Sequence, residues 1–256
     1  MTLKKKGFSG TTLKLIAITA MLIDHIGYIL LENGLLPLLA SAVIAGSSTG
    51  YLPEDYRTFA AIDTVLRLIG RVAFPIFCFL LVEGFCHTRS VKNYALRLGS
   101  FALISEIPFD LATNKTVYHP GYQNVFFTLL LGLLVLAGIR YTTDRLSAAQ
   151  TRQKPVFFLC QLLIVLVGCV LASVLHTDYS AFGVLAIVLL YLLRSNRKRQ
   201  CAVGALLFLW ELSAPLAFLI LYHYNGERGA AKSRYGFYLF YPVHLLLLVL
   251  LRLLLF

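Results

Sequence analysis

The stretch TLKLIAITAMLIDHIGYILL, residues 12–31, decides the fold class of this chain. Its ionisable groups are confined to Lys14, Asp24, His25 and Tyr28, and most other residues are apolar. A helix of this length, rising 1.5 Å per residue, is about 30 Å long, which matches the hydrocarbon core of a bilayer. The stretch is longer than the apolar segment of a signal peptide, so we expect a retained membrane span.

The composition of the whole chain agrees with this expectation. Of its 256 residues, 59% are hydrophobic and 14% are charged, and the mean hydropathy is +0.78. Soluble chains have roughly 45–50% apolar and about 25% charged residues, so a soluble globular enzyme, a disordered chain and a fibrous protein are excluded. The lipid bilayer is therefore the expected environment of the chain.

The net charge of +11 does not indicate a nucleic-acid partner. Nucleic-acid-binding motifs and long basic tracts are lacking, and cytoplasmic loops of membrane proteins collect Lys and Arg. The five cysteines are odd in number and form no CxxC pair, so they are interpreted as small core residues rather than disulfides or metal ligands.

Eight apolar runs are predicted to cross the membrane. They lie at 12–31, 64–86, 94–112, 124–141, 156–175, 180–194, 201–222 and 235–255. Helices satisfy their own backbone groups in hydrocarbon, so we predict an all-α transmembrane bundle of about eight spans. Residues 35–45 are too short to cross and are predicted to be re-entrant or interfacial; with broken helices the count reaches nine or ten. No repeat or linker is visible, and residues 1–256 are interpreted as a single membrane domain.

The distribution of basic residues places the N-terminus in the cytoplasm. The segments that are then internal carry fourteen Lys and Arg residues, whereas the first three external loops carry only Arg57 and Lys115. Residues 222–234 are basic but fall outside if 201–222 crosses once. A break at Ser213-Ala214-Pro215 would turn that span into a hairpin and return the loop inside; the sequence leaves both arrangements open. We expect a multi-pass protein of the cell (plasma or inner) membrane.

The pair Asp24-His25 is the leading candidate for a catalytic site. A charge at the centre of a span costs ~2.5–3.5 kcal/mol, so charges that persist there need a partner or a task. His25 is predicted to act as a general base, supported by the neighbouring Asp24 carboxylate. Tyr28, three residues on, shares its face and is placed in the same polar cavity. The alternative is a packed histidine bonded to a backbone carbonyl.

Cations within the spans are candidates for binding an anionic cofactor. Lys14 lies eleven residues before His25 and therefore on nearly the same helix face; its alternative is snorkelling to lipid headgroups. Asp63 and Arg67 are spaced to pair locally, which leaves Arg71 for a phosphate or for a structural ion pair. Glu106 and Asp110, which share a helix face, are assigned to the polar cavity and are the expected carboxylates if Arg71 forms such a pair.

Other polar residues are assigned to the cavity or to anion binding. In EGFCHTR, residues 83–89, Glu83 and His87 resemble half of a metal site, but no second half follows, so no metal is predicted. Four positions have equally good structural alternatives or weak signals. They are Arg89 at the inner end of its span, Asn124 as a helix N-cap, Arg228 in the YNGERG turn, and His244 as a core histidine.

Six motifs, in order, carry a family resemblance: LKLIAITAMLIDHIG, IGRVAFPIFCFLLVEGFCHTR, FALISEIPFDLA, QNVFFTLLLGLL, YNGERG and FYLFYPVHL. From Leu13 to His244 the chain resembles the TraX family of bacterial membrane proteins, whose founding members are associated with conjugation and acetylate the N-terminus of pilin. The family is similar to wider transmembrane acyltransferases, some of which carry Arg and His eleven residues apart in the first span. Lys14 and His25 occupy the matching positions here.

The resemblance implies an acyltransferase, specifically an acetyltransferase. Acetyl-CoA or another acyl-CoA would donate from the cytoplasm, and the acceptor would be an amine or hydroxyl of an exported protein or surface glycan. His25 is the expected base, and Lys14, Arg71 and Arg228 are expected to hold the donor. Direct transfer and an acyl-His25 intermediate both remain open. The alternatives are a proton-coupled transporter and a non-enzymatic factor for pilus assembly or secretion.

Overall fold

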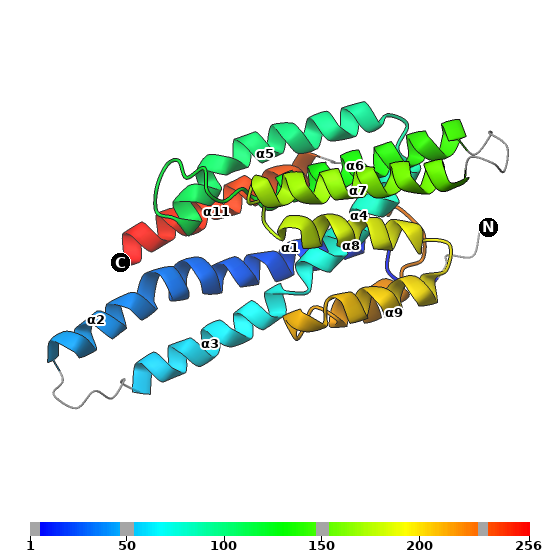
Figure 1. The fold of residues 1–256 in the computed structure, drawn as a ribbon. Helices are drawn as coiled ribbons and strands as arrows, with labels where there is room; N and C mark the ends of the chain where they lie inside the picture. Colours follow the sequence, from blue (N-terminus) through cyan, green and yellow to red (C-terminus); the bar gives the residue numbers. More distant parts are fainter. Residues whose placement is uncertain (1–5, 47–53, 147–153, 230–234) are drawn as a thin grey trace. The chain divides into compact units, whose positions relative to one another are not determined.

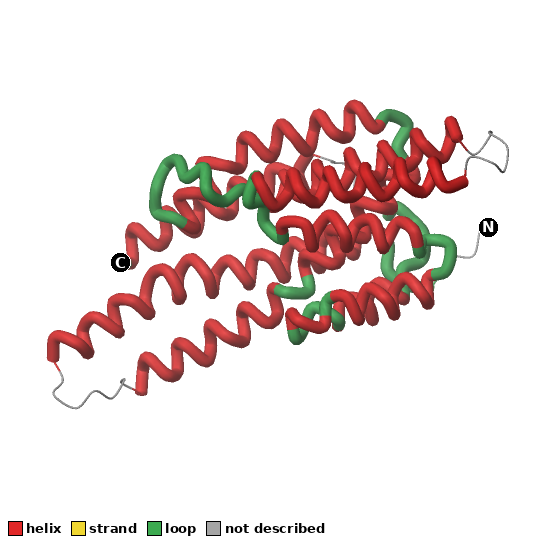
Figure 2. The backbone as a smooth tube through the Cα atoms, in the orientation of Figure 1, coloured by secondary structure: helices red, strands yellow, loops and turns green. Residues whose placement is uncertain are grey.

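The computed structural model describes residues 6–46, 54–146, 154–229 and 235–256, and all its regular elements are helical (Figures 1 and 2). Only two isolated β-bridges occur among these residues. The helices are α1 Gly10–Ile26, the π-helix η1 Gly27–Leu35, α2 Leu36–Gly46, α3 Glu54–Gly70, α4 Ala73–His87, α5 Val91–Thr113, α6 Val125–Leu146, α7 Lys154–Val174, α8 Ser180–Leu192, α9 Arg197–Leu207, the 3-10 turn η3 Leu209–Glu211, α10 Leu216–Tyr222 and α11 Tyr235–Leu255. The predicted all-α class is confirmed.

Five helical segments of the described chain are long and apolar enough to cross a membrane. They are Gly10–Ser41, Glu54–His87, Val125–Arg145, Pro155–Val174 and Tyr235–Leu255, and Ser180–Leu192 is a shorter apolar helix. Only 11% of the Pro155–Val174 window is buried, as expected of a helix whose leucines face lipid. A multi-pass helical membrane fold is therefore confirmed, and a count of about eight spans is roughly compatible with it.

The first span is longer than predicted. Helices α1, η1 and α2 follow one another without a loop, so 35–45 continues the first helix instead of forming a separate re-entrant or interfacial segment (Figure 1). The change to π-helical turns begins two residues after His25, and Asn33 Nδ2 donates to the Tyr28 carbonyl at 2.9 Å. Residues 47–53, part of the predicted external loop that carries Arg57, lie outside the described residues.

The predicted span 201–222 is broken where the sequence suggested. α9 ends at Leu207 and α10 begins at Leu216; between them Leu212 has φ +27° and Ser213 Oγ donates to the Leu68 carbonyl at 2.6 Å. Pro215 then precedes α10, where its missing N–H costs no helical hydrogen bond.

The loop after α10 returns to the beginning of α1. The amides of Phe8, Gly10 and Thr11 donate to the carbonyls of His223, Glu227 and Arg228 at 2.9, 2.8 and 3.0 Å. The loop therefore lies beside the start of α1, which is the arrangement that a hairpin at the break requires. Lys232 and Arg234, which were part of the predicted basic loop, lie outside the described residues.

The chain divides into two compact units. Unit 1 comprises Met1–Ile76, Ile107–Tyr118 and Phe208–Phe256, and unit 2 comprises Phe77–Glu106 and His119–Leu207. The interpretation of 1–256 as one domain stays a prediction.

In unit 1, α11 runs beside α1 and η1 in the same direction. Lys14 Nζ lies 5.2 Å from the Phe237 ring centroid near the start of both helices, and Gly34 meets Phe256 near their ends. Arg252 is buried and donates to the carbonyls of Leu111 and Ala112, the last turn of α5, at 2.9 and 3.3 Å. A cation suits these carbonyls because they form the negative end of a helix dipole.

In unit 2, α6 packs against α7 and α8 at small residues. Cβ atoms added at Gly132, Gly138 and Gly168 would lie 2.4, 2.9 and 2.2 Å from side-chain atoms of Ile187, Ile164 and Val135. Small residues let membrane helices approach closely, because association in lipid depends on packing.

Candidate functional site

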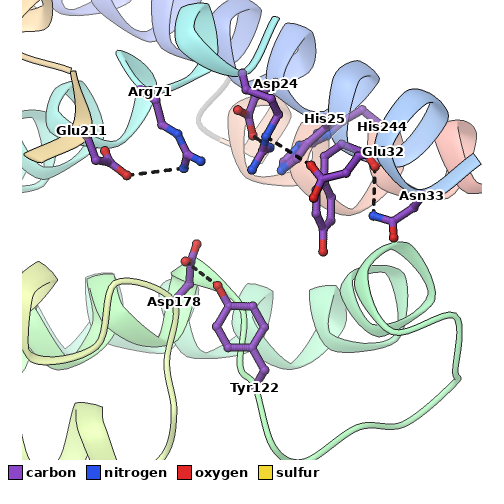
Figure 3. Close-up of polar contacts among 11 residues, drawn as sticks. Asp24, His25, Glu32, Asn33, Arg71, Tyr122, Asp178, Glu211 and His244 are labelled. Atoms are coloured by element: carbon purple, nitrogen blue, oxygen red, sulfur yellow. Dashed lines mark hydrogen bonds and ion pairs between the residues drawn. The ribbon is translucent and has the colours of Figure 1, made fainter. Parts of the chain in front are cut away.

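Two histidines form the centre of the candidate site in unit 1. His25 Nδ1 lies 2.6 Å from His244 Nε2, and the rings stack with centroids 4.9 Å apart (Figure 3). α1 supplies one ring and α11 the other. The ring of Phe240 stacks on His244 at 4.7 Å, and the edge of Tyr241 faces His25 at 6.0 Å. The predicted base therefore has a nitrogen partner that the sequence did not connect to it.

The hydrogen bonds of this pair determine where its protons lie. His244 Nδ1 is 2.7 Å from the Phe240 carbonyl oxygen, which only accepts, so this nitrogen carries a proton. In a neutral imidazole the other nitrogen, His244 Nε2, is then an acceptor, and His25 Nδ1 donates to it. It follows that His25 Nε2 presents a lone pair, which is what a general base requires.

The residue next to His25 belongs to an ion-pair cluster. Arg67 Nη1 lies 2.6 Å from Asp24 Oδ2, and Arg67 Nε lies 3.7 Å from Glu32 Oε2. The same guanidinium lies 4.9 Å from the centroid of the Tyr28 ring. Asp24 thus supports Arg67, whereas the sequence analysis assigned it to the imidazole. Glu32 and Arg67 complete a cluster in which one cation meets two carboxylates.

Two glycines bring α1 and α3 close enough for these contacts. A Cβ at Gly70 would lie 2.2 Å from Asp24 Cβ, and one at Gly27 would lie 2.8 Å from Asp63 Oδ1. Asp63 Oδ1 is buried and has no hydrogen-bond partner among the described residues. The predicted local pair of Asp63 and Arg67 is accordingly replaced by the pairing of Arg67 with the first helix.

Arg71 follows α3 and pairs with a residue that sequence reasoning missed. Its Nη1 lies 3.4 Å from Oε1 of Glu211, whose side chain is 5% exposed (Figure 3). The carboxylates expected for a structural pair were Glu106 and Asp110. Glu211 was overlooked because a single acidic residue in an apolar run gives no periodic signal, although its cost in hydrocarbon was a reason to consider it.

The other predicted cofactor-binding residues of unit 1 lie near the start of α1. Lys14 sits over the Phe237 ring, as described above. Arg228 is exposed, and its carbonyl oxygen accepts from the Thr11 amide and from Thr11 Oγ1 at 3.0 Å. Asp110, a predicted carboxylate partner rather than a cofactor-binding residue, is buried on α5 with 1% exposure.

Unit 2 contains the remaining predicted residues in two sets. In the first, Asn124 donates from Nδ2 to the carboxylate of Glu106 at 3.2 Å and to the Ala102 carbonyl at 2.8 Å, while its Oδ1 accepts from the Phe126 amide at 3.0 Å. Asn124 therefore caps α6, as its structural alternative predicted, and its amide also binds the Glu106 carboxylate. Its place in a polar cavity stays a prediction.

The second set surrounds the end of α4. Glu83 Oε1 lies 3.5 Å from Arg197 Nη2, and its carbonyl oxygen lies 2.8 Å from His87 Nδ1. His87 and Arg89 are exposed. Among the described residues no group of three His, Cys, Asp or Glu side chains is placed to hold a metal ion.

Helical spans that carry a hydrogen-bonded histidine pair and ion pairs within them define the class: this is a multi-pass α-helical membrane protein with an ionisable site inside its spans. The chain belongs to the TraX family, since the family described as TraX protein matches it over residues 9–252. The chain is also similar to the "Probable fimbrial assembly protein FimC, serogroup H1" of Dichelobacter nodosus, with 31% identity over 270 residues and 94% of each chain covered. No solved structure matches. The resemblance found in the sequence is confirmed.

Proposed function

We propose that this protein is a membrane-embedded acyltransferase, specifically an acetyltransferase, with His25 as its general base. One observation carries the proposal: the hydrogen-bond chain from Phe240 through His244 leaves His25 Nε2 with a lone pair inside a membrane span. Membership of the TraX family supports it further.

In the proposed reaction, the amine or hydroxyl of the acceptor attacks the thioester carbonyl of acyl-CoA. His25 Nε2 takes the acceptor proton as the new N–C or O–C bond forms. When the tetrahedral intermediate collapses, the C–S bond breaks and the CoA sulfur takes the proton from His25. The products are the acylated acceptor and CoA thiol, and the histidine returns to its starting state.

His244 and the ion-pair cluster are proposed to support this cycle. The lone pair of His244 Nε2 accepts from His25 Nδ1 throughout, so it holds the ring in one tautomer and stabilises the imidazolium. Asp24 and Glu32 balance the charge of Arg67 beside the histidine, which would otherwise oppose protonation of the ring. Lys14 and Arg228 remain the proposed contacts for the donor, whereas Arg71, which pairs with Glu211, is proposed to be structural.

The acceptor is proposed to be an exported protein, such as a pilin subunit, or a surface glycan met at the inner membrane. The name of the Dichelobacter relative, a fimbrial assembly protein, favours a pilus-related acceptor. The same name favours a second candidate function, that of a non-enzymatic factor in pilus assembly.

The test is the release of CoA thiol by the purified full-length protein, given acetyl-CoA and pilin peptides or glycan acceptors. His25→Ala should lower the rate by about 10²–10⁴-fold, the usual contribution of a general base. His223→Ala, at an exposed histidine of the loop after α10, is the matched control and should leave the rate unchanged. Activity within about threefold of wild type in the His25 variant would exclude the role.

Two further measurements separate the alternatives. Accumulation of a substrate inside vesicles that is driven by a pH gradient and needs no acyl acceptor would identify a transporter. If His25→Ala instead restores pilus assembly as well as the wild type does in a strain lacking the protein, the assembly function does not need the base.

A further inference from the structure

A group of arginines in unit 2 has more positive charge than its surroundings balance. Arg140 of α6 lies 4.2 Å from the Phe85 ring centroid, Arg194 after α8 lies 3.9 Å from that of Tyr191, and Arg197 of α9 lies 4.5 Å from that of Phe79. The rings of Phe85 and Tyr191 contact each other edge to face at 5.5 Å. Aromatic rings therefore hold three guanidinium groups from three helical segments around one end of α4.

Glu83 is the carboxylate that forms an ion pair with one of these three cations in the described part of unit 2. Glu83 pairs with Arg197 at 3.5 Å, whereas Arg140 and Arg194 form no ion pair with any described residue. Both of the latter lie close enough to the Cys86 thiol to act on it electrostatically. The cluster thus has an excess of about two positive charges.

Stacking on a ring leaves the edge of a guanidinium available. Its five N–H donors lie in the guanidinium plane, so a ring packed against the face positions the group without using the donors. Arg194 uses Nη1 to bind the Tyr191 carbonyl at 2.8 Å, which caps α8. Its other donors, and those of Arg140, suit the bidentate geometry of phosphate oxygens.

Helix α9 adds a second electrostatic reason. Its first turn is Arg197, Lys198, Arg199 and Gln200, and it contains no acidic residue. Cations are unfavourable at the positive end of a helix dipole, and an anion there would relieve the repulsion. Arg197 is also fixed before any ligand arrives, because its Nη1 donates to Gln200 Oε1 at 2.7 Å and Gln200 in turn donates to the Leu190 carbonyl at 2.6 Å.

We propose that Arg140, Arg194 and Arg197 form a binding site for a phosphate-bearing ligand at the end of α4. The distribution of charge in the sequence predicts that this end faces the cytoplasm. Two sources of phosphate meet the site there: the head group of an anionic phospholipid, and a soluble ligand such as CoA. Basic pockets between membrane helices on this side of a bilayer bind anionic head groups, so phospholipid and CoA are both tested as ligands.

The test compares two probes on the full-length protein. Retention of phosphatidylglycerol relative to phosphatidylcholine is measured by native mass spectrometry after extraction from mixed nanodiscs, and CoA affinity is measured by calorimetry in phosphatidylcholine nanodiscs. Arg140→Gln with Arg194→Gln should lower binding of one probe by at least about tenfold, which corresponds to the loss of one charge-assisted hydrogen bond. The probe that is affected identifies the source of the phosphate.

Arg145→Gln with Lys92→Gln is the matched control. Both side chains are exposed, and Arg145 also lies over a tyrosine ring, 5.5 Å from the Tyr141 centroid, so the control removes the same charge from similar settings. It should leave both probes within about twofold of wild type.

Two more variants keep the result interpretable. Arg140→Lys with Arg194→Lys retains the charge but loses the planar fork of the guanidinium group. It replaces the Gln pair if that pair does not fold, and it should still bind the affected probe more weakly than wild type. The CoA source rests on the proposed function, whereas the phospholipid source does not. His25→Ala should bind both probes normally, because this histidine is not part of the arginine site. Unchanged binding of both probes in a folded Arg140→Gln, Arg194→Gln protein would overturn the proposal.

Discussion

Two arginine pairs, one in each unit, differ in the groups that lie beside their charges. In unit 1, Arg67 meets Asp24 and Glu32, and Arg71 meets Glu211, so each of these cations has a carboxylate. In unit 2, Arg140 and Arg194 pack against aromatic rings instead. Opposite charges keep a site neutral within hydrocarbon, whereas rings position a cation without neutralising it.

The difference teaches what each region is suited to do. The carboxylates of Asp24 and Glu32 more than balance the charge of Arg67 beside His25. They therefore favour the protonated imidazole that a general base forms. An excess of fixed positive charge attracts anions, which suits binding. The same residue type, arginine, therefore takes different roles according to whether a carboxylate or a ring lies beside it.

The largest effect is expected in a test of membrane topology, because an introduced cysteine is labelled either from one side of the membrane or from the other. In a protein without native cysteines, Ser195→Cys of unit 2 and Glu227→Cys of unit 1 should both react with an impermeant thiol reagent from the cytoplasmic side. Lys115→Cys should react only from the opposite side. The carbonyls of the chain just before Lys115 accept hydrogen bonds from Arg252 near the end of α11, whereas the Glu227 carbonyl accepts one at the start of α1. Glu227→Cys labelling from the same side as Lys115→Cys would refute the hairpin.

The histidine site of unit 1 is tested next at His244. His244→Ala removes the acceptor of the His25 Nδ1 proton, so the tautomer is no longer fixed, and kcat should fall by about 10–100-fold with little change in KM. His244→Gln offers an amide oxygen in place of Nε2 and should retain more activity than the alanine variant. Steady-state kinetics on folded protein measures both, and Val243→Ala, at a half-exposed neighbour, is the control.

An alanine variant with normal kcat would reduce His244 to a packing residue. An equal loss in both His244 variants would show that an amide oxygen cannot replace the imidazole nitrogen as the acceptor.

Much of the fold was predictable because hydropathy is a local property. The apolar runs fix where helices lie, and Pro215 with Ser213 marked the break in 201–222. The length of the first span was missed, since Glu32 and Asn33 interrupt the apolar run that continues into α2. A π-helical segment with a side-chain hydrogen bond to Tyr28 accommodates these residues, and nothing in a hydropathy profile indicates it.

The candidate site was predictable as a set of residues but not as a set of contacts. Asp24, His25 and His244 were recognised because ionisable groups in hydrocarbon are costly. The pairing of His25 with His244 joins residues 219 apart in the chain, and the pairing of Arg67 with Asp24 joins residues 43 apart. Local spacing instead favoured Asp63 for Arg67, and a single sequence has no means of ranking such distant alternatives.

A smaller effect is expected where helices α1 and α3 touch. Gly70→Val places side-chain atoms where Asp24 lies, because a Cβ at position 70 would be only 2.2 Å from the Asp24 side chain, and overpacking of this kind costs about 1–3 kcal/mol. Gly99→Ala in unit 2 is the control, because its Cβ would lie at an ordinary 3.6 Å from Leu130. Thermal melts should show a clear loss for Gly70→Val alone, and equal melting temperatures would mean that the contact of α1 with α3 is loose.

The smallest effect is expected at Arg71, and it decides whether the ion pairs of unit 1 also serve the donor. The sequence favoured donor phosphate as the ligand of Arg71, whereas its contact with Glu211 favours a structural role. Arg71→Lys keeps the charge but loses the planar fork, so a structural arginine should lose about 0.5–1.5 kcal/mol of stability with unchanged CoA affinity. Glu211→Gln, which removes the buried partner charge, should lower the melting temperature in the same way and should not be additive with Arg71→Lys. Melting temperature and CoA affinity are measured on the same purified variants. A weaker CoA affinity in Arg71→Lys, with the melting temperature unchanged, would instead place Arg71 at the donor and make unit 1 a site that both binds and reacts.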